Sequence, residues 1–347
     1  MRAIRVGLIG CGRIAQLKHL PILAALPNAQ LVALAEHDAA RRAQAREQVP
    51  QAHAFASYQE LLYHSDVEAV VICLPSSLHA EAAIAALEAH KHVYLEKPIA
   101  TDLADAAAVV AAWREAQTIG MIGFNFRFDA RYQKMRQQVC TGAVGELLAV
   151  RSLYSTAART LPIWKERRSS GGGVLLDLAS HHIDLVRYVL DTEIELVWAD
   201  IISRRSEEDN ATLYLQLRSG LLVQSFFSMG SVDAHQFEVY GQEGRLMVDR
   251  LHAPDVELLR PSLKHLRLKR LGVFLRRLLY TPNYNQPFQA ALHTFVEAVR
   301  TGESVAPNLL DGCRSLAVVA AAEESARTYE AVALSESGAL SSLEAVQ

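Results

Sequence analysis

Short runs of aliphatic and β-branched residues alternate with longer helical stretches through the first third of the chain. The runs expected to form strands are Arg5–Ile9, Leu31–Ala35, Val67–Leu74, Val93–Glu96 and Gly120–Asn125. Strands that alternate with helices in this way are typical of a parallel sheet with crossover helices.

The pattern changes after Phe124, where strands begin to follow one another without helices between them. The expected strands are Leu147–Ser155, Ile194–Arg204, Ala211–Arg218, Leu221–Ser228, His235–Tyr240 and Arg245–Asp249. The expected helices are Asp129–Cys140, one that starts at Leu175, Asn285–Arg300 and Asp311–Tyr329. Consecutive strands joined by turn residues predict an open, mainly antiparallel sheet. We therefore expect an α+β domain over 124–334 and a tail over 335–347.

The turn after the first expected strand has the spacing of a phosphate-binding loop. Gly10, Gly12 and Ala15 form the pattern GxGxxA, with Arg13 and Ile14 at the start of the following helix. Glycines allow a tight turn and close approach to a pyrophosphate, and the helix start offers unpaired N–H groups. We interpret residues 1–123 as an α/β Rossmann domain with a dinucleotide contact at this turn. The alternative is a glycine turn in an α/β domain that binds no nucleotide.

Glu36 ends the second expected strand and bears on the choice of cofactor. A carboxylate there can accept hydrogen bonds from both ribose hydroxyls and would repel a 2′-phosphate, which favours NAD over NADP. Arg41 and Arg42 lie in the next helix and could neutralise such a phosphate, so NADP stays open as the less favoured cofactor.

Composition excludes several classes of protein. The 347 residues are 50% hydrophobic and carry a net charge of −3, which gives no argument for nucleic-acid or membrane binding. The four cysteines are widely spaced, so we expect neither a disulfide framework nor a metal site. The apolar run Val6–Ile9 is too short for a signal peptide, and we expect a cytoplasmic protein.

Lys97 follows the strand Val93–Glu96 and precedes Pro98. Ligands of doubly wound sheets bind beyond the carboxyl ends of the strands, so this lysine is placed to donate to a substrate oxygen. A lysine at a strand end taken alone is usually a solvated surface residue, and the nucleotide-binding context is what favours catalysis here.

A second candidate group follows three consecutive glycines. Asp177, His181 and Asp184 have a spacing that places them on one face of a regular helix. Histidine suits general acid–base catalysis near neutral pH, and Asp177 could orient its ring or hold a substrate hydroxyl. His182 competes for the role, but it lies about 100° away on the helix, and we favour His181. Asp184 is interpreted as structural.

Several motifs together resemble one known family. Gly10–Ala15, Cys73–His79, Glu96–Pro98, Gly123–Phe128 and Gly171–Asp184 occur in the order seen in the glucose–fructose oxidoreductase, inositol dehydrogenase and rhizopine catabolism (Gfo/Idh/MocA) family. The resemblance extends over nearly the whole chain, and Glu-Lys-Pro is among the more specific signatures of that family. It implies that Lys97 and His181 are catalytic and that Asp177 assists.

The resemblance also implies further contacts. Leu74, Pro75 and His79 would lie along the nicotinamide side of the cofactor, together with Glu96, although His79 could equally serve capping or packing. Arg127 would contact the substrate or tie the domains together.

The chain is basic between Arg260 and Arg277. We interpret this stretch as a solvated amphipathic segment or as a surface for an anion, such as a nucleotide diphosphate or an anionic membrane.

The leading prediction is an NAD-dependent oxidoreductase that acts on a secondary alcohol or ketone of a sugar, cyclitol or nucleotide sugar. One alternative is a glycosidase-like enzyme that holds NAD tightly and acts by transient oxidation and elimination. Another is a non-catalytic dinucleotide-binding sensor. The resemblance implies a homodimer or homotetramer.

Overall fold

The computed structural model describes residues 2–63, 66–260 and 280–334. The chain divides into two compact units. The first comprises residues 1–125, 169–171 and 285–316, and the second comprises 126–168, 172–284 and 317–347. Residues 285–316, which the sequence analysis assigned to the second domain, are thus part of the first unit.

The first unit is built on a six-stranded parallel sheet of order β3-β2-β1-β4-β5-β6. The strands are β1 (Ile4–Ile9), β2 (Ala29–Ala35), β3 (His53–Phe55), β4 (Ala69–Ile72), β5 (His92–Leu95) and β6 (Gly120–Ile122). The order reverses between β1 and β4, which is the arrangement of a doubly wound Rossmann sheet. We did not predict β3 from the sequence, because a three-residue strand is too short to show an alternation of apolar and polar residues.

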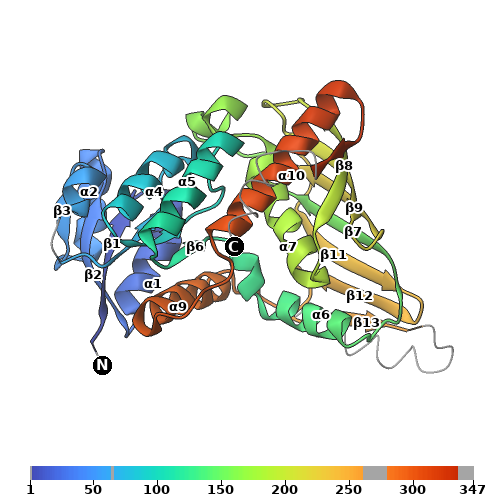
Figure 1. Cartoon of the computed structure of the whole chain (residues 1–347), viewed down its shortest axis with the longest axis horizontal. Coiled ribbons are helices and arrows are strands. Elements are labelled where there is room, and N and C mark those ends of the chain that lie inside the picture. The colour runs from blue at the N-terminus through green and yellow to red at the C-terminus, as the bar shows by residue number, and fades with distance from the viewer. Residues whose placement is uncertain (1, 64–65, 261–279, 335–347) are drawn as a thin grey trace. The chain divides into compact units, whose positions relative to one another are not determined.

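Helices cover both faces of this sheet. They are α1 (Leu20–Ala25), α2 (Ala39–Gln48), α3 (Tyr58–Leu62), α4 (His79–Glu88), α5 (Leu103–Ala116), α9 (Gln286–Thr301) and the first half of α10 (Leu309–Thr328). α4 lies beside α5 and packs on β4 and β5 (Figure 1). α9 packs against α1, β1 and β5, which explains why it belongs to this unit although it comes late in the chain.

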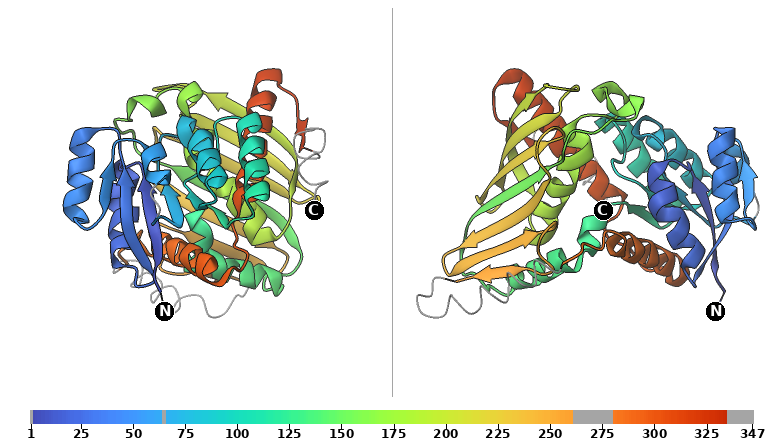
Figure 2. Two further views of the ribbon diagram at one scale, coloured as in Figure 1. Left: turned by 60° about the vertical axis from the view of Figure 1, so that its left-hand side comes forward. Right: turned by 180° about the vertical axis from the view of Figure 1, so that it is seen from behind.

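The second unit is built on an eight-stranded sheet of order β13-β12-β11-β7-β10-β9-β8-β14 (Figure 2). The strands are β7 (Leu147–Ser155), β8 (Ile194–Ile202), β9 (Asn210–Leu217), β10 (Leu222–Ser228), β11 (Ala234–Gly241), β12 (Gly244–Asp249), β13 (Glu257–Leu259) and β14 (Val332–Ala333). All pairs are antiparallel except β7 with β10. The expected fold class, a Rossmann domain followed by a mainly antiparallel α+β domain, is confirmed.

Two helices pack beside each other in this unit, α6 (Ala130–Cys140) and α7 (Ser180–Leu190). A π-helical turn, η6 (Leu175–Ala179), leads into α7 and contacts β7 and β10. The core under these helices is apolar and aromatic, with Phe227 and Phe237 fully buried.

No helix within the described ranges is both long enough and apolar enough to cross a membrane. Within the same ranges, no group of three or more His, Cys, Asp and Glu side chains is arranged to hold a metal ion. The basic stretch of 260–277 lies outside the described residues except for Arg260.

Candidate functional site

The turn after β1 holds the glycines of the predicted phosphate-binding loop. Gly10 has a φ of +86°, and a Cβ at this position would lie 2.8 Å from the carbonyl oxygen of Cys73. A Cβ at Gly12 would meet no described atom within 4 Å. The helix starts directly afterwards, at Arg13. Gly10 therefore allows the turn to pack against the neighbouring strand, whereas the space beside Gly12 is open to a ligand.

Glu36 follows β2, and its buried carboxylate reaches back to this turn. It accepts hydrogen bonds from the backbone N–H groups of Cys11 (2.9 Å) and Asp38 (3.0 Å) and from the guanidinium of Arg41 (3.1 Å). Burial raises the pKa of Glu36, but these donors outweigh burial and hold it below its usual value. Arg42 donates instead to the carbonyl oxygen of Glu36. The carboxylate is thus ionised and fixed beside the glycine turn.

A buried hydrogen bond between Glu96 and His19 supports the lysine after β5. Glu96 lies 2.7 Å from Nε2 of His19, which belongs to the π-helical turn η1 (Ala15–His19), and it accepts the backbone N–H of Lys97 at 3.2 Å. His19 is fully buried and Glu96 nearly so, whereas the Lys97 side chain is partly exposed. The Lys97–Pro98 peptide bond is cis. The contacts hold the Lys97 backbone while its side chain keeps access to solvent.

His79, the first residue of α4, lies between two turns of the same sheet edge. Its Nδ1 is 2.6 Å from the carbonyl oxygen of Pro98, and its Nε2 is 2.9 Å from that of Leu74. The ring is 1% exposed.

These residues share one edge of the first sheet. Gly10 follows β1, Glu36 follows β2, Leu74 follows β4 and Lys97 follows β5, and the four strands are parallel. The carboxyl edge of such a sheet is where doubly wound folds bind ligands. The first unit therefore brings together the predicted contacts at Gly10, Gly12, Arg13, Ile14, Glu36, Leu74, Pro75, His79, Glu96 and Lys97.

The second unit holds the histidine and its neighbouring aspartate. Asp177 lies in η6, and His181 and Asp184 lie in α7. The expectation of one regular helix from Asp177 to Asp184 is wrong, because the π-helical turn over Leu175–Ala179 changes the period. Such turns occur frequently at functional sites.

Asp177 is engaged by basic residues that the sequence analysis did not single out. Its Oδ1 lies 2.5 Å from Nζ of Lys165, and its Oδ2 lies 3.8 Å from the guanidinium of Arg159. A Cβ at Gly172 would lie 2.3 Å from the carbonyl oxygen of Lys165, so only glycine lets the loop pack here. The glycines thus serve the approach of the loop that carries Lys165.

The two adjacent histidines have different environments. His181 is partly exposed, and its ring stacks on Phe126 at a centroid distance of 4.2 Å. His182 is 1% exposed and is surrounded by rings, among them Tyr154 at 5.6 Å and His235 at 5.0 Å. Neither ring nitrogen of His182 has a hydrogen-bond partner among the described residues. His181 is therefore the more accessible of the two.

Arg127 makes a bidentate ion pair with the buried carboxylate of Asp184, with N···O distances of 2.8 and 2.5 Å. Both residues lie in the second unit. The ion pair holds the segment around Phe126 against α7. Asp184 therefore has a structural contact in the fold.

Sequence reasoning missed His19, Lys165 and Arg159. A histidine soon after a glycine turn could have been noticed, but its partner Glu96 is remote in sequence. The basic loop 157–168 has no regular period, so nothing in the sequence indicated which cation meets Asp177.

Comparisons with known proteins agree with the fold. The model of an oxidoreductase family with an NAD-binding Rossmann fold matches residues 4–124, and a GFO/IDH/MocA C-terminal domain matches residues 132–247. Myo-inositol 2-dehydrogenase of Thermotoga maritima is 30% identical over 342 residues, which cover 96% of this chain and 99% of that protein.

Two further comparisons concern proteins of Actinomadura kijaniata. A dTDP-3,4-didehydro-2,6-dideoxy-α-D-glucose 3-reductase is 30% identical over 93% of this chain and 96% of its own length. The crystal structure of a 3-ketoreductase in complex with NADP and TDP-benzene has a TM-score of 0.81 and 26% identity, and covers 93% of this chain and 98% of that chain.

The buried ring of His182 predicts a measurable sensitivity to acid. Burial, with the charge of Arg250, lowers the pKa of His182 to about 3. The unfolded chain takes up this proton below pH about 6.5, so stability is lost as the pH falls from there towards about 3. Urea unfolding should show that His182→Phe removes about 2 kcal/mol of the wild-type loss between pH 7 and pH 5.

The control is His53→Phe, at an exposed histidine of β3, which should leave the pH dependence unchanged. Part of the wild-type slope should persist in His182→Phe, because burial also lowers the pKa of His235. An unaltered slope in His182→Phe would contradict the prediction.

Proposed function

Because this chain belongs to the Gfo/Idh/MocA oxidoreductase family, as its sequence motifs indicated, we propose that it oxidises a secondary alcohol, or reduces the matching ketone, of a sugar, cyclitol or nucleotide sugar. The relatives named as an inositol dehydrogenase and as a ketoreductase of a dTDP-linked sugar support this range of substrates. The observation that carries the proposal is the shared sheet edge, where the open turn at Gly12, the carboxylate of Glu36 and the ammonium of Lys97 follow β1, β2 and β5 of one parallel sheet.

The residues of the first unit fit NAD. The open space beside Gly12 allows close approach of a pyrophosphate, and the fixed carboxylate of Glu36 can accept both ribose hydroxyls. Arg41 and Arg42, which could have served a 2′-phosphate, are engaged by the Glu36 carboxylate and backbone. We expect NAD to be preferred over NADP, although the 3-ketoreductase structure contains NADP.

When bound, NAD would supply the hydride acceptor or donor, and the residues of this chain would transfer the hydroxyl proton. Lys97 donates a hydrogen bond to the substrate oxygen, and Glu96, which is hydrogen-bonded to His19, keeps the Lys97 backbone in place. His181 accepts the hydroxyl proton during oxidation and returns it during reduction.

Asp177 and Arg127 have supporting roles in this proposal. Asp177 holds a second substrate hydroxyl or orients His181, and Lys165 holds the Asp177 carboxylate in place by an ion pair. Arg127 is committed to Asp184, so we assign it to the support of the helix that carries His181 and not to substrate contact.

The chemistry of a glycosidase-like enzyme would use the same residues. Transient oxidation, elimination of the glycosidic group and reduction of the product would give net hydrolysis without net formation of NADH. A sensor without catalysis would need neither Lys97 nor His181.

Buried thiols at Cys11, Cys73 and Cys313 fit a cytoplasmic location, where cysteines stay reduced.

The test is a panel of polyols, cyclitols and nucleotide sugars with NAD and with NADP, followed by absorbance of the reduced cofactor. Turnover should be greater with NAD than with NADP. Lys97→Ala and His181→Ala should each lose at least about a hundredfold in kcat/KM, because each removes a proton-handling group. Lys134→Ala, at an exposed lysine paired with Asp255, should behave as wild type.

Retained turnover in both Lys97→Ala and His181→Ala would remove the catalytic assignment. Cleavage of a glycoside without a net change in NADH would select the glycosidase-like alternative. Cofactor binding without turnover of any substrate on the panel would favour the sensor.

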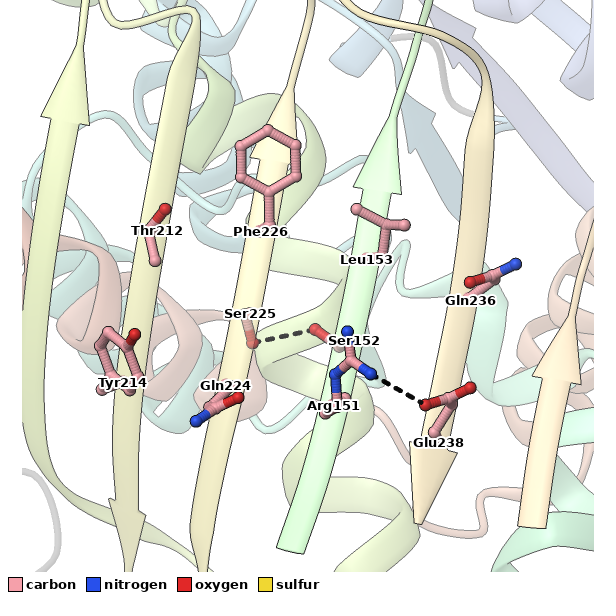
Figure 3. Close-up of a pocket in the computed structure, with 10 residues that line it drawn as sticks. All are labelled: Arg151, Ser152, Leu153, Thr212, Tyr214, Gln224, Ser225, Phe226, Gln236 and Glu238. Atoms are coloured by element: carbon pink, nitrogen blue, oxygen red, sulfur yellow. Dashed lines mark hydrogen bonds and ion pairs between the residues drawn. The ribbon is translucent and has the colours of Figure 1, made fainter. Parts of the chain in front are cut away.

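The open face of the second sheet supports a homo-oligomer. Residues of β7, β9, β10 and β11 line a hollow of about 330 Å³ on this face (Figure 3). Large apolar side chains there are partly exposed, including Tyr214 (47%) and Phe226 (40%). Contiguous exposed apolar groups mark interaction surfaces, and we expect this face to join copies of the chain into a homodimer or homotetramer.

Light scattering coupled to size-exclusion chromatography should give the mass of an oligomer for the wild type. The double variant Tyr214→Asp with Phe226→Asp should give a smaller mass, because it replaces two exposed aromatic side chains of this face by charges. Tyr63→Asp, at an aromatic residue that is 88% exposed on the first unit, is the control. A monomeric wild type, or an unaltered mass in the double variant, would contradict the expectation.

A further inference from the structure

The contacts of His79 do not fit a capping role. α4 begins at His79, but its N-cap residue is Leu78, and no side chain makes a capping hydrogen bond there. Both ring nitrogens of His79 instead face carbonyl oxygens of other turns, Nδ1 towards Pro98 and Nε2 towards Leu74. The ring is buried, so water cannot substitute for these acceptors.

The two carbonyl groups belong to the two turns that carry predicted contacts. Leu74 and Pro75 form the turn after β4, and Pro98 follows Lys97 after β5. β4 and β5 are adjacent parallel strands, so the two turns lie next to each other at the same sheet edge. One rigid aromatic ring thus spans the turn expected to contact the cofactor and the turn expected to act on the substrate.

The protonation state of the His79 ring determines how many of the two carbonyl oxygens it can donate a hydrogen bond to. A carbonyl oxygen only accepts, so a neutral ring can donate to one of the two turns and an imidazolium to both. Burial is the largest effect and lowers the pKa of His79 overall, although the two carbonyl groups and the charge of Glu96 raise it; the charge of Lys97 also lowers it. Glu96 and Lys97 come from the end of β5, and they face the ring together with the backbone of both turns. The neutral ring, with one N–H, is therefore the form expected near neutral pH.

The lysine is then held from two sides. Its own N–H donates to Glu96, which His19 fixes through η1. The next residue, Pro98, has no N–H, and its carbonyl oxygen is held by His79. The side chain of Lys97 lies between these two anchored points of the backbone.

We propose that His79 is a positioning residue whose buried ring contacts both turns, donating to one of them, and thereby fixes the spacing between the cofactor turn at Leu74 and the catalytic turn at Lys97. The proposal rests on the function proposed above. His79 acts through the two turns and needs no direct contact with the cofactor.

Two conservative substitutions separate the two contacts. The amide nitrogen of Asn can take the place of Nδ1, so His79→Asn keeps a polar contact with Pro98 and loses the contact with Leu74. The amide nitrogen of Gln can take the place of Nε2, so His79→Gln keeps a polar contact with Leu74 and loses the contact with Pro98. Exposed His53 offers the matched controls His53→Asn and His53→Gln.

Amide hydrogen exchange of the cofactor-free protein measures the local stability of each turn separately. His79→Asn should speed exchange in residues 74–78 by about three- to tenfold and leave residues 97–101 near the wild-type rate, since only the contact with the turn at Leu74 is lost. His79→Gln should give the reverse pattern, and the His53 variants should change neither segment. Equal effects on both segments, no effect on either, or failure of both variants to fold would overturn the proposal.

Steady-state kinetics then connects the turns to function. His79→Asn should mainly raise the KM for NAD, and His79→Gln should mainly lower kcat, each by about three- to tenfold. Equal effects of the two variants on KM and kcat would contradict separate roles. If the wild type neither binds a dinucleotide nor turns over a substrate, the proposed function fails, whereas the exchange pattern still decides whether His79 ties the two turns.

Discussion

Close packing of the turn after β1 against the residue after β4 is the constraint on which the candidate site depends. The backbone N–H of Gly10 donates a hydrogen bond to the carbonyl oxygen of Ala35 at 2.8 Å. The φ of Gly10 is +86°, which residues with a side chain rarely adopt. Any Cβ there would meet the carbonyl of Cys73. The absence of a side chain at Gly10 therefore lets β1, β2 and β4 converge at one edge.

This packing sets the places of the chemical groups around it. Glu36 can reach the N–H of Cys11 because β2 ends beside the glycine turn. The turn after β4 is in turn connected to the turn after β5 by the ring of His79, and Glu96 connects that last turn to the first helix through His19. The edge is a continuous hydrogen-bonded arrangement in which each predicted contact is positioned by a neighbour.

The second unit positions its groups by a different means, the stacking of rings and the pairing of charges. Phe126 has the ring of His181 on it at 4.2 Å and the guanidinium of Arg250 at 3.9 Å from its centroid. Lys165 fixes Asp177, and Arg127 fixes Asp184. Buried charges of this kind are stable only with a partner, so removal of either member of a pair affects the geometry of the helix.

Several residues of the candidate site could be predicted from the local order of residues in the sequence. The glycine turn, the carboxylate at Glu36 and the lysine after β5 could be predicted because each depends on the order of strand, turn and helix. The contacts of His19 with Glu96 and of Lys165 with Asp177 could not, since they join residues 77 and 12 positions apart through the tertiary fold. The π-helical turn before α7 could not be predicted either, because hydrophobic periodicity does not reveal one inserted residue. Strand β3 was too short to be predicted from its pattern of residues.

Titration of NAD into the wild type and the Gly12→Ala variant tests the central claim most directly. A Cβ at Gly12 meets no described atom within 4 Å, so the thermal unfolding of the variant should match that of the wild type. The same methyl group would occupy the space needed by the pyrophosphate, and the affinity for NAD should fall by at least about tenfold. Unaltered affinity in a folded Gly12→Ala variant would contradict the account.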